Sequence, residues 1–300
     1  CSLVAAGSWQ SAPPHALILG LKELPESSEQ VHHRHIYFAH AFKQQAGWQD
    51  LLSRFQSGGG TLYDLEYLVN TDGRRVAAFG YWAGFAGAGV ATMAWAGQRC
   101  EEVPELARLT SCPNKDGLID RCRQQLSHCF EAPRVMVIGA AGRCGGGATE
   151  IFRELNADIT LWDIEETRNG GPFEQILEHD IFVNCVFVST RIPPFLTPEL
   201  LAKPRRLSVI CDVSCDPFGK LNPLPVYDRC TTFADPLQRV VAGENPLDLI
   251  AIDHLPSLLP KESSEDFSDQ LLPHLLNLSD TRNEVWSGAR RKFEQTLGDL

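Results

Sequence analysis

The sequence has no run of strongly apolar residues approaching the roughly 20 that a membrane-spanning helix needs, so no membrane attachment is predicted. It also lacks a positively charged start followed by an apolar stretch, which argues against a signal peptide. Basic residues are few: 27 Lys and Arg stand against 38 Asp and Glu, for a formal net charge of −11. Without a basic stripe to neutralise phosphates, no nucleic-acid partner is expected.

Metal-binding patterns are missing although the chain has ten cysteines. There is no C-x-x-C pair and no Cys/His spacing typical of zinc, so no metal is expected. Scattered thiols in a chain of 300 residues indicate a reducing compartment, where we expect free or buried cysteines. The C-terminal Gly298-Asp299-Leu300 is not a peroxisomal signal. We therefore predict a cytoplasmic location.

An α/β fold is predicted from short apolar segments that alternate with helical patterns. The segments span residues 134–139, 158–162, 180–188 and 207–213. Such alternation is typical of a parallel sheet covered by helices on both faces. At roughly 100–200 residues per domain, we predict two Rossmann-like domains with parallel sheets and an interdomain cleft.

The domain assignment follows the composition. We predict a dinucleotide-binding domain over residues 78–282, and a substrate domain over 1–77 completed by a returning helix over 283–300. Residues 15–20 predict a short buried strand. Residues 77–98 are rich in Ala and Gly, which suits a tightly packed helix joining the two domains. His32, His33 and His35 are interpreted as a solvated loop rather than a metal site.

A glycine-rich turn follows the apolar residues 135–138. Gly139, Gly142 and Gly145 are spaced G-x-x-G-x-x-G. The first two allow a sharp turn and a close approach to a pyrophosphate, and Gly145 allows helix and strand to pack closely. Asp163 ends the next predicted strand, where a carboxylate binds the adenosine ribose and repels a 2′-phosphate. The pattern predicts NAD binding; the alternative is a purely structural turn.

Longer blocks of sequence resemble one enzyme family. They are GLKELP at 20–25, FAH at 38–40, QAGW at 45–48, GTLYDLE at 60–66, GRRVAAFG at 73–80, GRCG at 142–145, GGPF at 170–173 and IDHLPSLLP at 252–260. Together they resemble the fungal saccharopine dehydrogenases that form L-lysine with NAD, from about residue 7 to about residue 293. The wider relatives are alanine dehydrogenase and the nicotinamide-binding transhydrogenase.

The resemblance implies a reaction. Saccharopine, NAD and water would give lysine, 2-oxoglutarate and NADH, the last step of lysine biosynthesis by the α-aminoadipate route. A hydride leaves the carbon that bears the secondary amine, and the resulting imine is hydrolysed. This chemistry needs acid–base groups that titrate near neutrality and cations that hold substrate carboxylates. The implied partners are these small molecules alone, with the chain acting as a monomer.

The resemblance also implies which residues carry the chemistry. Lys22 and His40 fall at the family's catalytic positions and share the proton transfers. Glu23 and Glu66 are the neighbouring carboxylates that tune their pKa values. Without the resemblance, Lys22 would be interpreted as a surface lysine, and His40 as an ordinary core or surface residue.

Further positions are implied to contact the ligands. The substrate-binding residues are Gln45, Arg74 and Ser214. The cofactor-binding residues are Arg74, Gly139, Gly142, Arg143, Cys144, Gly145, Asp163, Thr167, Phe187, Val213, Ile252, Asp253, His254 and Leu255. Cys144 and Cys185 lie at or just beyond the ends of neighbouring predicted strands, so we expect an oxidation-sensitive pair.

The chain departs from the family at its start. The family has a further N-terminal segment, with an arginine that grips a substrate carboxylate, and that segment is missing here. We therefore expect a truncated substrate domain in which the strand at 15–20 leaves an unpaired edge. Two other interpretations stay open: a catalytically impaired NAD-binding paralogue or fragment, and an alanine dehydrogenase-like enzyme. The blocks at 60–66 and 252–260 argue against the second.

Overall fold

A computed structural model describes residues 2–21, 24–25, 27–43, 47–100, 102–186, 188, 190–217, 219–280 and 282–300. The chain divides into two compact units. Unit 1 comprises residues 1–78 and 267–300, and unit 2 comprises residues 79–266. The sequence predicted the second boundary at 282/283, but it falls inside helix α7 (Pro260–Leu276). The end of α7 belongs to unit 1 because Phe267 packs on Phe38 and Gln270 accepts a hydrogen bond from the Ala78 N–H.

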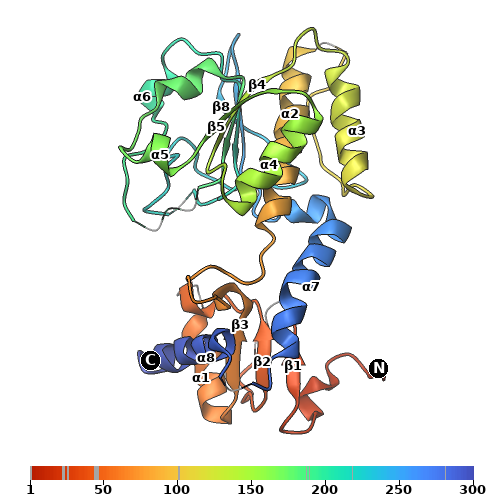
Figure 1. The fold of residues 1–300 in the computed structure, drawn as a ribbon, viewed down its shortest axis with the longest axis vertical. Helices are drawn as coiled ribbons and strands as arrows, with labels where there is room; N and C mark the ends of the chain where they lie inside the picture. The colour runs from red at the N-terminus through yellow and green to blue at the C-terminus, as the bar shows by residue number, and fades with distance from the viewer. Residues whose placement is uncertain are drawn as a thin grey trace. The chain divides into compact units, whose positions relative to one another are not determined.

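Unit 1 is built on a parallel sheet with strand order β1-β2-β3, namely Leu17–Leu19, Arg34–Tyr37 and Thr61–Asp64. Helices α1 (Trp48–Gly58) and α8 (Glu284–Leu297) lie beside β3 (Figure 1). The short helical turns are η1 (Ser8–Ser11), η2 (Ala41–Lys43) and η3 (Leu65–Tyr67). The rings of Phe55 and Phe293 lie 6.0 Å apart, so the C-terminal helix shares a core with α1.

Two expectations for unit 1 are wrong. Strand β1 lies at the edge of the sheet, as expected for the strand at 15–20, but it is not buried, and Leu19 keeps 55% of its surface exposed. The predicted loop of histidines instead leads into the central strand β2, and only His32 is exposed. His33 and His35 point into the interior because alternate residues of a strand share a face. His35 packs against the rings of Trp9 and Phe55.

Unit 2 contains a six-stranded sheet with strand order β5-β4-β6-β7-β9-β8. The strands are β4 (Arg134–Ile138), β5 (Asp158–Trp162), β6 (Ile181–Asn184), β7 (Val209–Asp212), β8 (Gln238–Val241) and β9 (Leu247–Ile250). Strand β8 runs antiparallel to β9 and the other pairings are parallel. The sequence missed β8 and β9, which form a short hairpin through Gly243 at φ +111°.

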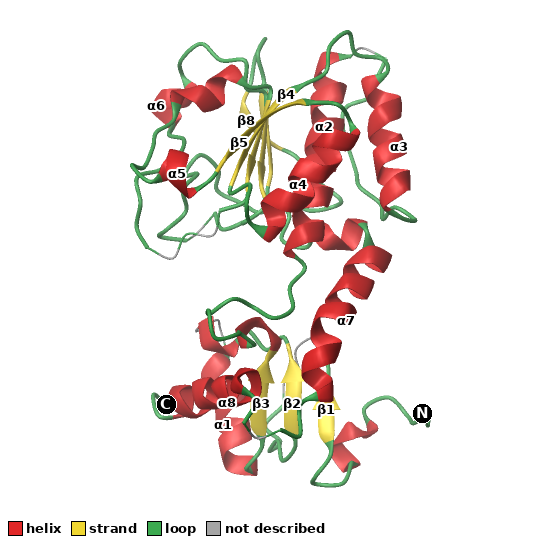
Figure 2. Ribbon diagram, viewed as in Figure 1, coloured by secondary structure: helices red, strands yellow, loops and turns green. Residues whose placement is uncertain are grey.

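Helices cover both faces of this sheet (Figure 2). One face carries α2 (Gly80–Arg99), α3 (Lys115–Leu126), α4 (Arg143–Glu154) and η5 (Leu255–Leu258); the other carries α5 (Ile164–Thr167), η4 (Glu174–Glu178) and α6 (Pro198–Leu201). Along β4, Val135 and Val137 enter the first core while Met136 and Ile138 enter the second. The predicted α/β fold with parallel sheets is confirmed; the interdomain cleft stays a prediction.

Helix α2 packs against α4 at backbone distance. A Cβ on Gly84 would lie 1.8 Å from the Cys144 carbonyl oxygen, and one on Gly147 would lie 1.9 Å from the Tyr81 carbonyl oxygen. The small residues therefore allow close packing, as the composition predicted. However, α2 does not join the two units, because it lies wholly within unit 2.

A disulfide links Cys100, just after α2, to Cys129, just after α3. The expectation of free thiols is wrong for these two residues, whose helices pack against each other. Cys185 is a free thiol. Among the described helices, none combines the length and the apolar character needed to cross a bilayer.

The buried His35 makes the stability of unit 1 depend on pH. Burial lowers its pKa from 6.5 to about 4, and the charges of His33 and Arg54 add to the effect. The unfolded chain therefore binds a proton between pH 6.5 and pH 4 that the folded chain does not. Stability should fall by up to about 3 kcal/mol as the pH drops through this range, since one pKa unit corresponds to about 1.4 kcal/mol.

We expect His35→Phe to remove this part of the pH dependence, measured as the midpoint of denaturant unfolding at pH 7.5 and pH 5. The exposed His15 supplies a control, since His15→Gln should keep the wild-type profile. An unchanged slope in His35→Phe would assign the acid sensitivity to other groups.

Candidate functional site

The glycine loop lies at the switch point of the large sheet. Strand β4 ends at Ile138, and α4 begins at Arg143 with Gly142 as its N-cap. Strands β5 and β6 pair with opposite edges of β4. The loop at 139–142 therefore opens where the strand order reverses, the position at which doubly wound sheets bind nucleotides.

Backbone contacts show why this loop needs glycines. Gly139 adopts φ +87°, and a Cβ there would lie 2.9 Å from the carbonyl carbon of Cys185. A Cβ on Gly145 would lie 2.2 Å from the Gly139 carbonyl oxygen and 2.5 Å from the Ala140 Cα. The first turn of α4 is therefore pressed against the loop. The N–H groups and the positive dipole end at the start of this helix suit a pyrophosphate, so these residues fit a dinucleotide.

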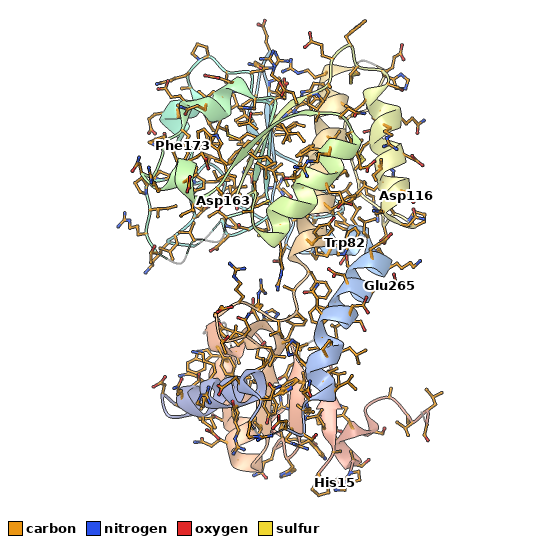
Figure 3. All side chains as sticks on the ribbon, in the orientation of Figure 1. His15, Trp82, Asp116, Asp163, Phe173 and Glu265 are labelled. Carbon is orange, nitrogen blue, oxygen red and sulfur yellow. A yellow bond between two sulfur atoms is a disulfide. The ribbon has the colours of Figure 1, made fainter. Side chains whose placement is uncertain are left out.

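Asp163 is fixed beside the loop at the start of α5 (Figure 3). Its carboxylate accepts hydrogen bonds from the Ala141 and Ile164 N–H groups, each at 2.8 Å. The Glu166 carboxylate in turn accepts a hydrogen bond from the Asp163 N–H at 2.8 Å. Each Asp163 oxygen retains acceptor capacity for a ribose hydroxyl. The hydroxyl of Thr167 donates to the Asp163 carbonyl at 2.8 Å and so helps to hold this turn.

A buried polar network supports the ends of β6 and β7. Asp212 accepts hydrogen bonds from the Tyr227 hydroxyl at 2.6 Å, the Asn184 amide at 2.9 Å and the Ser214 N–H at 3.1 Å. Burial raises the pKa of the Asp212 carboxyl, and these hydrogen bonds lower it again. Ser214 also donates its hydroxyl to the Val186 carbonyl at 2.7 Å. The network fixes the backbone at 213–214. Sequence reasoning missed it, although Asn184 and Asp212 interrupt apolar strands.

The predicted contacts at 252–255 separate into two kinds. Ile252 and Leu255 are each 1% exposed and belong to the core, so their side chains are not presented to a ligand. Asp253 and His254 are exposed, and the His254 ring stacks on Phe233 at 4.9 Å. Of these four residues, Asp253 and His254 are the ones open to a coenzyme.

Arg143 and Cys144 begin α4 beside the loop. Arg143 is exposed, whereas Cys144 lies against α2, where a Cβ on Gly80 would be 3.1 Å from its sulfur. Burial raises the pKa of the Cys185 thiol, and the nearby Cys144 thiol raises it further. The two predicted partners are therefore neighbours, with the oxidation-sensitive pair itself left as a prediction.

In unit 1, the structure brings together His40 and Glu66, two of the residues predicted for catalysis. His40 Nδ1 lies 3.3 Å from Glu66 Oε2. Their side chains are 31% and 15% exposed, so the pair is partly desolvated. His40 has a left-handed backbone, with φ +52°. The carboxylate can only accept, which favours the imidazole tautomer with its hydrogen on Nδ1.

Two neighbours of this pair were missed by sequence reasoning. Arg75 Nη1 lies 3.7 Å from Glu66 Oε1, whereas the predicted Arg74 is exposed in the turn that follows Asn70. Asp64 is fully buried, and its Oδ1 accepts from the Glu66 N–H at 3.0 Å. Burial raises the pKa of the Asp64 carboxyl, and the adjacent Glu66 charge also raises it. Asp64 therefore fixes the backbone that carries Glu66.

Some predicted site residues lie outside the described part of the chain: Lys22, Glu23, Gln45 and Phe187. Within the described ranges, no group of three or more His, Cys, Asp and Glu residues has the arrangement of a metal site.

Comparisons with known proteins first show the class of protein that this chain resembles. Residues 1–86 match the family model described as the N-terminal domain of alanine dehydrogenase/PNT. A solved L-alanine dehydrogenase is similar over 98% of this chain and 84% of its own, with a TM-score of 0.61 at 15% identity. The fold is that of alanine dehydrogenase, and the glycine loop with Asp163 adds the features of a dinucleotide-binding enzyme.

The particular family follows from closer relatives. Proteins named saccharopine dehydrogenase [NAD(+), L-lysine-forming] from Yarrowia lipolytica, Schizosaccharomyces pombe and Emericella nidulans are 48%, 47% and 49% identical to this chain. The matches cover 98–99% of the chain and 83–84% of these relatives. The chain belongs to this family of saccharopine dehydrogenases, which confirms the resemblance inferred from the sequence blocks.

Substitution of two neighbouring glycines tests whether the close backbone contact shapes the binding loop. Gly145→Ala forces a methyl group against the Gly139 carbonyl, whereas nothing lies within 4 Å of a Cβ on Gly146. Overpacking costs about 1–3 kcal/mol. We expect Gly145→Ala to lower the unfolding midpoint and to weaken NADH binding at least about tenfold, which corresponds to about 1.4 kcal/mol.

Gly146→Ala is the matched control and should keep wild-type NADH affinity, measured by calorimetry on both variants. Equal affinities for Gly145→Ala and Gly146→Ala would mean that the close contact does not shape the binding loop.

Proposed function

We propose that the protein oxidises saccharopine with NAD and water, giving L-lysine, 2-oxoglutarate and NADH. The observation that carries this conclusion is the identity of 47–49% with three saccharopine dehydrogenases over nearly the whole chain. The likeness to L-alanine dehydrogenase, at 15% identity, concerns the fold alone. The cytoplasmic location and the monomeric state stay predictions.

The coenzyme would be held by unit 2. The loop at 139–145 supplies backbone N–H groups for the pyrophosphate, and Asp163 supplies a carboxylate for the ribose. The other half of the coenzyme would lie near the ends of β7 and β9, where the chain offers Val213, Ser214, Asp253 and His254. NAD supplies the hydride acceptor when it is bound. The negative Asp163 disfavours the extra phosphate of NADP.

Proton transfer would fall to unit 1. Glu66 holds the Nδ1 side of His40, so the exchange of a proton with the substrate amine or with water falls to Nε2. The pairing of Glu66 with Arg75 supports this orientation. Lys22, with Glu23 beside it, is predicted to share these transfers.

Substrate recognition requires cations, because saccharopine carries several carboxylates. Arg74 is exposed and follows the turn that begins at Asn70, so we propose that it binds one of these carboxylates. Gln45 and Ser214 are proposed to bind the substrate as well; the hydroxyl of Ser214 is positioned by Val186.

The activity can be measured directly. We expect NADH oxidation when lysine and 2-oxoglutarate are supplied together, and no comparable turnover with pyruvate and ammonia. NADPH should replace NADH poorly because of the charge of Asp163. Tight NADH binding without any oxidation would instead identify a catalytically impaired member of the family.

The acid–base residues can be tested by substitution. We expect His40→Gln and Lys22→Met each to reduce kcat by about 100-fold or more, the usual contribution of general acid–base catalysis, while NADH affinity changes little. His128 offers a matched control because it also pairs with a carboxylate, Glu102 at 2.8 Å, but at the surface of unit 2.

His128→Gln should therefore retain wild-type kcat. Parallel losses of kcat and NADH affinity in His40→Gln would indicate damage to folding rather than a role in proton transfer.

A further inference from the structure

Two thiols that no step of the proposed reaction uses lie side by side at the carboxyl ends of the parallel strands in unit 2. Cys215 Sγ and Cys230 Sγ are 3.6 Å apart. Neither takes part in the disulfide of this chain. Cys215 follows β7 and is partly buried, whereas Cys230 is exposed. A solute can therefore reach the pair through Cys230.

The two thiols are held together by shared anchors. Cys215 donates a hydrogen bond to the Ala251 carbonyl at 3.0 Å. Thr231, the residue after Cys230, donates its N–H to the same carbonyl at 2.8 Å, and its hydroxyl accepts from the Ala251 N–H at 3.0 Å. A single residue at the end of β9 thus fixes both segments.

A second anchor lies three residues before each cysteine. The Tyr227 hydroxyl donates to Asp212 at 2.6 Å, and both side chains are buried. The loop that carries Cys215 and the segment that carries Cys230 are therefore tied together at Asp212 and again at Ala251. With both backbones held by these anchors, the sulfurs must approach from 3.6 Å to the roughly 2 Å of an S–S bond.

We propose that Cys215 and Cys230 form a modification site at which a small hydroperoxide converts the two thiols into an intramolecular disulfide. The site concerns the residues of unit 2 alone and does not depend on the proposed enzyme activity.

The exposed thiol reacts first. The Cys230 thiolate attacks one oxygen of hydrogen peroxide, the O–O bond breaks, and the departing hydroxide takes up a proton to become water. Cys230 is then a sulfenic acid. Burial raises the pKa of the Cys215 thiol, and the neighbouring Cys230 and Asp253 raise it further, so Cys215 stays protonated and reacts second.

Cys215 then attacks the sulfur of the sulfenic acid. The S–O bond breaks, the S–S bond forms, and the leaving hydroxide departs as a second water with the Cys215 proton. In sum, two thiols lose two protons and two electrons, and one peroxide is reduced to two waters. The disulfide ties the backbone after Val213 and Ser214 to the segment before Thr231.

The experiment uses the full-length chain treated with hydrogen peroxide after removal of reductant. Remaining thiols are alkylated, the protein is digested without reduction, and the peptides are identified by mass spectrometry. We expect a linked peptide that contains Cys215 and Cys230, lost again on addition of dithiothreitol. In Cys215→Ser, the sulfenic acid on Cys230 should persist and be trapped by dimedone.

Cys230→Ser should give no link and no dimedone adduct on Cys215. A control variant, Cys112→Ala, removes a buried thiol outside the site and should form the Cys215–Cys230 link as the wild type does. The proposal fails if both thiols of the wild type are still alkylated after peroxide. It also fails if the only new link joins other cysteines, such as Cys144 and Cys185.

Discussion

The glycine loop of unit 2 depends on the contact between the first turn of α4 and the residues that precede this helix. The Gly139 carbonyl occupies the space where a side chain on residue 145 would be. The same helix presses its backbone against α2 through Gly84 and Gly147. Because these contacts are made between backbones, the helix start and its N–H groups are fixed relative to β4. That fixed start is what a pyrophosphate requires, and Asp163 is tied to the same loop through Ala141.

In unit 1, the interaction between His40 and Glu66 depends on the partial burial of the Glu66 carboxylate. Glu66 is only 15% exposed, and its neighbours are a histidine, an arginine and the buried Asp64. In such an environment a carboxylate interacts more strongly with a histidine than it would in water. The left-handed backbone at His40 and the capping bond from Asp64 then fix the two ends of the interaction. The histidine proposed as the general acid–base group is thereby oriented by the chain before any substrate binds.

Sequence reasoning succeeded where local pattern and chemistry agree. The apolar residues of β4, the glycines after it and Asp163 at the end of β5 form one local unit, so their arrangement could be predicted without tertiary information. The pairing of His40 with Glu66 was implied by family resemblance, because the two residues are far apart in sequence. Spacing alone does not reveal that contact.

The errors share a different cause. Strand β8 is QRVV and β9 is LDLI, so polar and charged residues break the apolar runs, and their hairpin becomes evident only beside β7. The burial of His33 and His35 was missed because their polarity suggested solvent, while the central position of β2 decides otherwise. The Cys100–Cys129 bridge depends on how α2 and α3 pack, which the sequence does not encode locally. Arg75, rather than Arg74, reaches Glu66 because of the turn geometry that begins at Asn70.

The central proposal is that a glycine loop and a carboxylate at the carboxyl ends of parallel strands hold NAD. A crystal structure of the complex with NADH tests it most directly. The account predicts the pyrophosphate on the N–H groups at the start of α4 and an adenosine ribose hydroxyl on Asp163. Density for NADH at any other place would contradict it.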